Sequence, residues 1–74
     1  MTGSKEYLAG ESFEKVVSWY EVELGDRKDL VGQDIQKDLA VWVYEPSNYD
    51  NGIMVSVARN GDGRTGITNM TYLK

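Results

Sequence analysis

Hydrophobic residues in the first third of the chain recur with a helical period. In residues 12–24 the apolar positions fall on one helical face, Phe13, Val17, Tyr20 and Leu24, widened by Val16 and Trp19. Ser12 is suited to an N-cap, and Glu14 in the first turn complements the helix dipole. Gly25 is placed to adopt the left-handed conformation that often ends helices. The pattern predicts an amphipathic helix over residues 12–24.

The second half of the chain has the composition of strands. Residues 39–44 are rich in β-branched and aromatic side chains and end before Pro46. Residues 53–59 and 64–73 predict two further strands, and the Asn-Gly-Asp-Gly run at residues 60–63 between them is a tight hairpin signal. These segments predict an antiparallel sheet.

Two remaining segments are less regular. Residues 5–9 predict a short first strand that Gly10 interrupts, whereas residues 26–38 alternate charges with isolated apolar residues. We expect that second segment to be a long connection with room for one strand-like or helical turn. The whole chain, residues 1–74, is therefore predicted to be a single α+β domain. One helix would pack on an antiparallel sheet of three to four strands in a βαβββ-like order.

Apolar residues occupy both faces of this predicted sheet. Because successive strand side chains point to opposite faces, one face is expected to hold Leu39, Val41, Val43, Ile53, Val55 and Val57. The other is expected to gather Ala40, Trp42, Tyr44, Met54, Ala58, Met70 and Tyr72. An antiparallel sheet with one solvated face is normally polar there. A single helix covers one face, so the sequence predicts a second apolar face that needs another cover.

The short length of the chain favours an additional contact surface, because a small domain has a thin hydrophobic core. A domain of 74 residues buries only about 60% of the surface that its unfolded chain exposes. Small domains usually gain stability from disulfides, a structural metal or oligomerisation. The sequence has no Cys and no His, which excludes disulfides and disfavours a metal. Of the three usual sources of added stability, oligomerisation is the one that the composition leaves open.

The charges argue against several classes of partner. Eight Lys and Arg against twelve Asp and Glu give a net charge of −4, and the basic residues are scattered. We therefore expect no nucleic-acid binding and no attraction to anionic lipid. Without a long apolar run or a signal-peptide core, no membrane span is expected. The expected location is cytoplasmic, or extracytoplasmic if an upstream signal has been removed.

The sequence contains no motif for catalysis, a cofactor or a metal. Residues 60–66 lack the ligand spacing of an EF-hand and the Lys-Ser/Thr pair of a P-loop. Without His or Cys, acid–base or nucleophilic chemistry would need deeply buried carboxylates. We therefore expect no enzyme, no cofactor and no metal site, with a carboxylate enzyme as the least favoured alternative.

The aromatic and methionine face is the candidate functional surface. Its proposed contact residues are Trp42, Tyr44, Met54, Met70 and Tyr72, with Tyr49 as a weaker recognition residue in the loop after residue 44. Residues of these types are enriched in interface cores. Three kinds of cover are considered: another part of this chain (residues 26–38, the N-terminal strand or the chain ends), a second copy, or a different ligand or protein. The leading hypothesis is a non-enzymatic homodimeric interaction module, and the alternative is a small-molecule pocket between this face and residues 26–38.

Residues 7–24, with the run Glu-Ser-Phe-Glu-Lys-Val-Val-Ser-Trp-Tyr at 11–20, resemble a pattern found in uncharacterised small prokaryotic proteins. In that pattern a short strand leads to a helix with valines followed by an aromatic pair, and an antiparallel sheet follows. Many of those proteins are exported or lipid-anchored. The resemblance implies the fold and carries over no catalytic residue.

Overall fold

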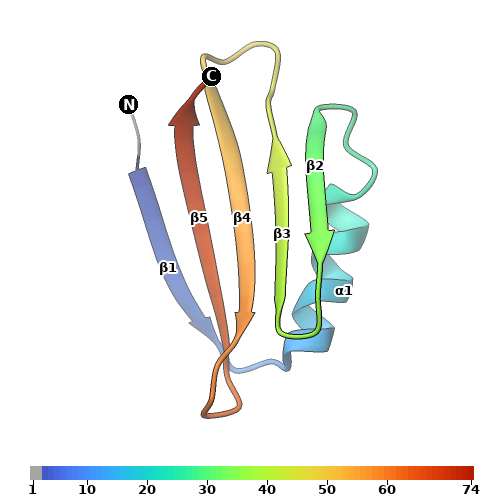
Figure 1. The fold of residues 1–74 in the computed structure, drawn as a ribbon, viewed down its shortest axis with the longest axis vertical. Coiled ribbons are helices and arrows are strands. Elements are labelled where there is room, and N and C mark those ends of the chain that lie inside the picture. The colour runs from blue at the N-terminus through green and yellow to red at the C-terminus, as the bar shows by residue number, and fades with distance from the viewer. Residues whose placement is uncertain (1–2) are drawn as a thin grey trace.

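The computed structural model describes residues 3–74, which form one helix and a five-stranded antiparallel sheet (Figure 1). The sheet order is β1-β5-β4-β3-β2. The elements are β1 (Gly3–Ala9), α1 (Phe13–Leu24), β2 (Leu30–Ile35), β3 (Leu39–Tyr44), β4 (Asn51–Arg59) and β5 (Thr65–Leu73). The predicted α+β class and antiparallel sheet are confirmed, but the sheet has five strands where three to four were predicted.

The additional strand is β2, inside the segment that was expected to be a connection. It pairs with β3 and forms one edge of the sheet, while β1 pairs with β5 and forms the other. The register of β2 shifts between Leu30 and Gly32. Such a bulge breaks the two-residue alternation by which a strand is recognised in a sequence. The irregularity explains why this strand was not predicted.

The helix begins as predicted and ends differently. The Ser12 hydroxyl accepts a hydrogen bond from the Lys15 backbone N–H at 3.2 Å, which caps the first turn. Gly25 was expected to be left-handed but has right-handed angles, with φ of −64° and ψ of −27°. Its N–H donates to the Glu21 carbonyl at 3.0 Å, so the helical hydrogen bonding simply runs one residue further.

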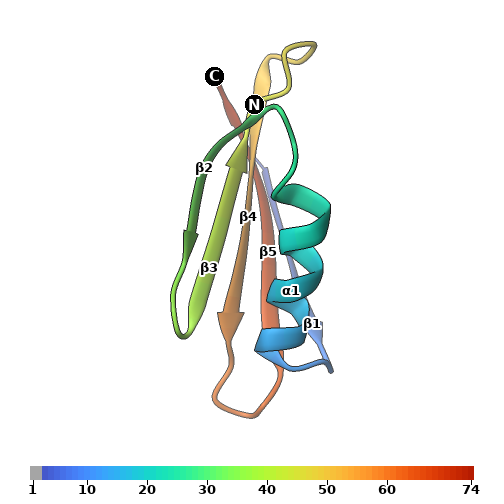
Figure 2. The ribbon, with the colours of Figure 1, turned by 90° about the vertical axis from the view of Figure 1, so that its right-hand side faces the viewer.

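The core lies between α1 and one face of the sheet (Figure 2). Its buried apolar residues are Phe13, Val16, Val17 and Leu24 from the helix and Ala40, Trp42, Val55 and Val57 from β3 and β4. Tyr20 is half-buried beside them, whereas Trp19, predicted to widen the buried stripe, is 58% exposed. The helix therefore covers the middle of one face and leaves the other face bare.

The predicted hairpin between β4 and β5 is confirmed. The Asn60 N–H donates to the Arg64 carbonyl at 2.9 Å, and the Gly63 N–H donates to the Asn60 carbonyl at 3.2 Å. Gly63 has a φ of +88°, a conformation that glycine adopts without a steric penalty. This turn fixes the register of the two central strands that carry the candidate site.

Candidate interaction surface

The strand register decides which side chains share a face, because directly paired residues of an antiparallel sheet point the same way. Trp42 pairs with Val55 across β3 and β4, whereas Met54 pairs with Val43 on one side and Met70 on the other. The predicted grouping of Trp42 with the two methionines is therefore wrong. The expected alignment of β3 against β4 was one residue out of step, which exchanges the faces of one strand.

Trp42, predicted as a contact residue, is a core residue. Its side chain is fully buried, and its ring centroid lies 5.6 Å from that of Tyr20 on the helix. The indole Nε1–H donates to Gln33 Oε1 at 3.0 Å, so the buried donor is satisfied. The alternative of a ligand pocket between the predicted aromatic face and residues 26–38 stays a prediction, but the indole of Trp42 has no exposed surface to offer a ligand.

Tyr44, the second aromatic residue of β3, also lies on the helix side. It is half-buried, and the Arg27 guanidinium lies over its ring at 4.2 Å from the centroid. Arg27 also forms a bidentate pair with Asp29 at 2.8 Å, and that pair lowers the pKa of Asp29. Tyr44 thus packs against the segment between α1 and β2 on the helix side of the sheet.

The helix lies on one side of the sheet (Figure 2), and the other side is called the open face below; the strand register decides which side chains stand on it. Its apolar members are Leu8, Leu39, Val41, Val43, Met54, Ala58, Met70 and Tyr72. Leu8 is 57% exposed, and Leu39 and Met70 are each 40% exposed. No element of the described chain packs against this face. The expected surplus of apolar surface is present, with Val41 and Val43 in place of Trp42 and Tyr44.

Tyr72 closes one end of the open face. Its ring lies against Gly52, its direct partner across β4 and β5. The phenol hydroxyl donates to Glu45 Oε2 at 2.7 Å, and this hydrogen bond raises the pKa of Tyr72. Gly52 is consequently buried although it has no side chain of its own. The fixed ring supplies a rigid apolar wall at this end.

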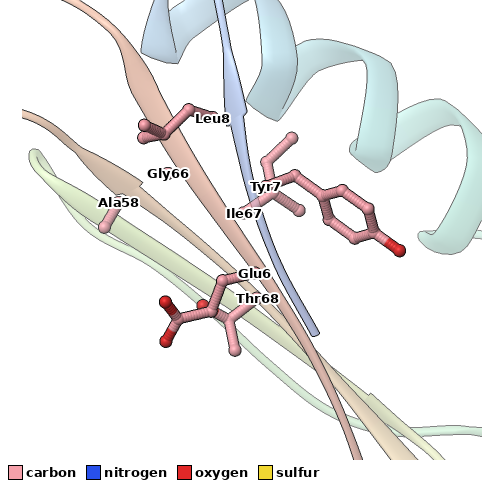
Figure 3. A pocket seen from close by; sticks show the side chains of 7 residues that line it. All are labelled: Glu6, Tyr7, Leu8, Ala58, Gly66, Ile67 and Thr68. Atoms are coloured by element: carbon pink, nitrogen blue, oxygen red, sulfur yellow. The ribbon is translucent and has the colours of Figure 1, made fainter. Parts of the chain in front are cut away.

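The other end of the open face is hollow. A depression of about 520 Å³ lies between β1, β5 and β4. Figure 3 shows its lining residues, which are Glu6, Leu8, Ala58, Gly66 and Thr68 together with Tyr7 and Ile67. Tyr7 and Ile67 point toward α1, whereas Glu6, Leu8 and Thr68 project to the opposite side. Ala58 and Gly66 provide almost no side-chain bulk between Leu8, which pairs with Gly66, and Leu39, which pairs with Ala58. A partner side chain can therefore approach the backbone here.

The open face is apolar in the middle and acidic at its two edges. Glu6 on β1 pairs with Thr68, and Asp34 on β2 pairs with Val41, so both carboxylates stand on this face. Both are exposed. An apolar centre with a charged, solvated rim is the usual anatomy of a protein interface.

Arg59 sits on the other side of the sheet and joins three elements. Its guanidinium binds Glu14 at the helix start and Asp38 Oδ1 at 2.8 Å, and lies 4.8 Å from the Phe13 ring centroid. The hydrogen bond from Arg59 lowers the pKa of Glu14. The contacts lie away from the open face, and their evident consequence is to hold α1 against the sheet.

Among the other depressions of the described chain, two lie beside the helix and at the loop after β3. One of about 310 Å³ runs beside the helix and is lined by Glu11, Lys15, Val16, Trp19, Tyr20 and Ile67. Another of about 420 Å³ lies between residues 27–29 and the loop that holds Tyr49, which is 67% exposed. Tyr49, the weaker recognition residue, lies in the loop between β3 and β4 and not in the strands that carry Met54 and Met70.

Within residues 3–74, no three His, Cys, Asp or Glu side chains are grouped so as to hold a metal ion. In the same range, the helix is too short and too polar to cross a bilayer. Comparison with known proteins found no matching family model, no matching curated protein and no matching solved structure. The functional inference therefore depends on the open face itself.

Proposed function

We propose that this protein is a non-enzymatic interaction module that self-associates through the open face. The observation that supports it most strongly is the uncovered strip formed by Val41, Val43, Met54 and Met70 in the centre of the sheet. Burying apolar surface contributes roughly 25 cal/mol per Å². A second copy presents the same strip, so each copy supplies the cover that the other lacks.

The dimensions of the molecule fit this role. Its extents are 37 × 25 × 16 Å, and the sheet spans the two longer ones (Figure 1). The rectangle of 37 by 25 Å, which also takes in the loops and the edge of α1, encloses roughly 900 Å², so the open face is of the same order as the ~800 Å² that each partner contributes to a standard interface. The open face is therefore large enough for a specific dimer without help from the helix side.

The side chains of the strip are suited to packing against another sheet. Met54 and Met70 are flexible and polarisable, so they adapt to an imperfect opposing surface. Val41 and Val43 are β-branched and rigid, which limits the side-chain entropy lost on burial. Ser56 and Thr68 lie in the same row as Val41, are half-buried, and can exchange hydrogen bonds with water or a partner.

Charge substitutions test this proposal. Met70→Glu places a carboxylate in the middle of the strip and should weaken the self-association constant at least about tenfold, because a charge is costly to bury. Val22→Glu is the matched control, since Val22 is 74% exposed on the outer side of α1. Sedimentation velocity over a concentration series measures the self-association of both variants. Equal association by Met70→Glu, Val22→Glu and the unsubstituted chain would exclude the open face as the contact.

A second candidate is the binding of a small apolar ligand in the groove beside the helix. That groove is lined by Val16, Trp19, Tyr20 and Ile67, and its volume of about 310 Å³ is at the lower end for ligand sites. An apolar probe that does not itself fluoresce, such as cyclohexanol, should shift the fluorescence of Trp19. A Trp19→Phe variant, which keeps Trp42, reports whether the response comes from this groove; an unchanged response in that variant would exclude it.

A further inference from the structure

The open face is organised in three parallel rows where it crosses β4 and β5. Directly paired residues form each row: Ala58 with Gly66, Ser56 with Thr68, and Met54 with Met70. Residues two apart on one strand lie about 7 Å apart, since a strand rises about 3.4 Å per residue. The first and third rows are therefore equally distant from the middle one.

The two outer rows have opposite shapes. The row of Ala58 and Gly66 is the floor of the hollow in Figure 3, with Leu8 on its β1 side and Leu39 on its β3 side. The row of Met54 and Met70 carries two long side chains, and that of Met70 is 40% exposed. The hollow and the ridge are thus complementary features on a single surface.

We infer that two copies pack open face to open face with the methionine row of each in the hollow of the other. A two-fold axis between the sheets, perpendicular to the strands and level with Ser56 and Thr68, exchanges the two outer rows. Symmetric dimers need such a self-complementary patch. The sheets would lie about 10 Å apart with their strands aligned within about 30°. The inference rests on the proposed self-association and specifies its geometry.

The competing symmetric arrangement fits less well. A two-fold axis parallel to the strands places each row over the same row of the other copy. The methionines would then meet methionines, and the hollow floored by Ala58 and Gly66 would face another hollow. Unfilled apolar space is costly, at about 24 cal/mol per Å³ in cores. The axis perpendicular to the strands fills both hollows at once.

Cross-linking with single cysteines tests this arrangement, because the sequence has no Cys of its own. Met54→Cys and Ala58→Cys are made in chains that carry tags of different size, mixed, and treated with a short bismaleimide that spans the gap between two sheets. The mixture should give the mixed dimer as its main product. Met54→Cys alone should give much less product, since its two copies would lie about 14 Å apart along the strands.

A second experiment does not depend on cross-linker chemistry. Met54→Ala removes part of the ridge, and Ala58→Met fills the hollow, so each should weaken dimerisation about tenfold. The double variant exchanges ridge and hollow and should recover to within about threefold of the original constant, because the complementary surfaces are restored. Both positions are at least partly exposed in the monomer, so its fold should tolerate each change.

The outcomes separate this geometry from the proposed function. If the unsubstituted chain dimerises but Met54→Cys cross-links mainly to itself and the double variant stays weak, the geometry is wrong and self-association stands. If the unsubstituted chain is monomeric throughout the concentration series, the proposed function fails, and the geometry with it. Preferential mixed cross-linking together with recovery in the double variant supports both.

Discussion

Tyr72 and Gly52 face each other across β5 and β4, and the tyrosine ring occupies the space that a side chain at position 52 would fill. The phenol hydroxyl is held by Glu45 at 2.7 Å, so the ring cannot swing away without losing a charge-assisted hydrogen bond. A glycine in a central strand normally weakens it. Here the neighbouring aromatic ring replaces the missing side chain.

Gly52→Val should therefore destabilise the monomer by about 1–3 kcal/mol, because the new side chain clashes with a fixed ring. Tyr72→Ala alone should also destabilise it, since Gly52 becomes uncovered. The double variant should lose less free energy of unfolding than the sum of the two single losses, because the valine takes the space that the tyrosine ring has left. Chemical denaturation measures all three, and strict additivity would show that the ring and Gly52 are not coupled.

The two tryptophans should respond to substitution in opposite ways. Trp42 is fully buried, and Trp42→Ala should cost about 3–5 kcal/mol, a large part of the roughly 4–11 kcal/mol expected for 74 residues. Trp19→Ala, at a position 58% exposed, should cost under about 1 kcal/mol. Thermal unfolding followed by circular dichroism compares them. A similar loss for both variants would contradict the burial of Trp42.

Stability should fall in acid because of the ion pair between Arg59 and Glu14. The folded pKa of Glu14 lies below its ordinary value of 4.5, and the hydrogen bond from Arg59 is the main cause. A lowered folded pKa contributes stability that is present above 4.5 and is lost as the pH falls through the folded value. Arg59→Gln should raise the Glu14 pKa toward 4.5 in an NMR titration of the side-chain carboxyl.

Arg64→Gln provides the control for that titration. Arg64 lowers the pKa of Asp62 in the β4–β5 turn through a side-chain hydrogen bond. Within residues 3–74 the ion-pair partner of Arg64 is Asp62, whereas that of Glu14 is Arg59. The Arg64→Gln substitution should therefore raise the pKa of Asp62 and leave the pKa of Glu14 unchanged. A Glu14 titration that is the same in the Arg59 and Arg64 variants would show that the ion pair is not formed in solution.

Self-association should strengthen with added salt. In the proposed dimer the Glu6 carboxylates of the two copies lie at the same level on the edge of the sheets, and each copy carries a net charge of −4. Salt screens such repulsion, because the Debye length falls from about 10 Å at 0.1 M to about 3 Å at 1 M. Glu6→Gln should tighten dimerisation and reduce its salt dependence. Dissociation on adding salt would indicate a contact held by opposite charges instead.

Local patterns in the sequence predict the single elements well. The helix that Ser12 caps follows from side-chain periodicity, strand β3 (Leu39–Tyr44) follows from its β-branched and aromatic composition, and the hairpin at residues 60–63 follows from its turn residues. Each of these signals is contained within a few neighbouring residues. The uncovered apolar face is also predictable, because it follows from the number of helices available.

Pairing between strands is where the sequence prediction fails. Both sets of alternate residues in β3 are apolar, so nothing in that strand indicates which set faces the helix. Trp42 is placed inward by its alignment with Val55 and by Gln33 on β2, a strand hidden by its bulge. Such non-local information is absent from any single segment. The methionines remain on the predicted surface, whereas Trp42 and Tyr44 do not.

Sedimentation equilibrium of the unsubstituted chain, from low micromolar to several hundred micromolar, tests the central proposal most directly. If two open faces cover one another, the weight-average mass should rise with concentration from 8.3 kDa toward twice that value. It should then stay at the dimer, because the symmetric contact leaves no open face unpaired. A constant mass of 8.3 kDa over the whole range would contradict self-association through this surface.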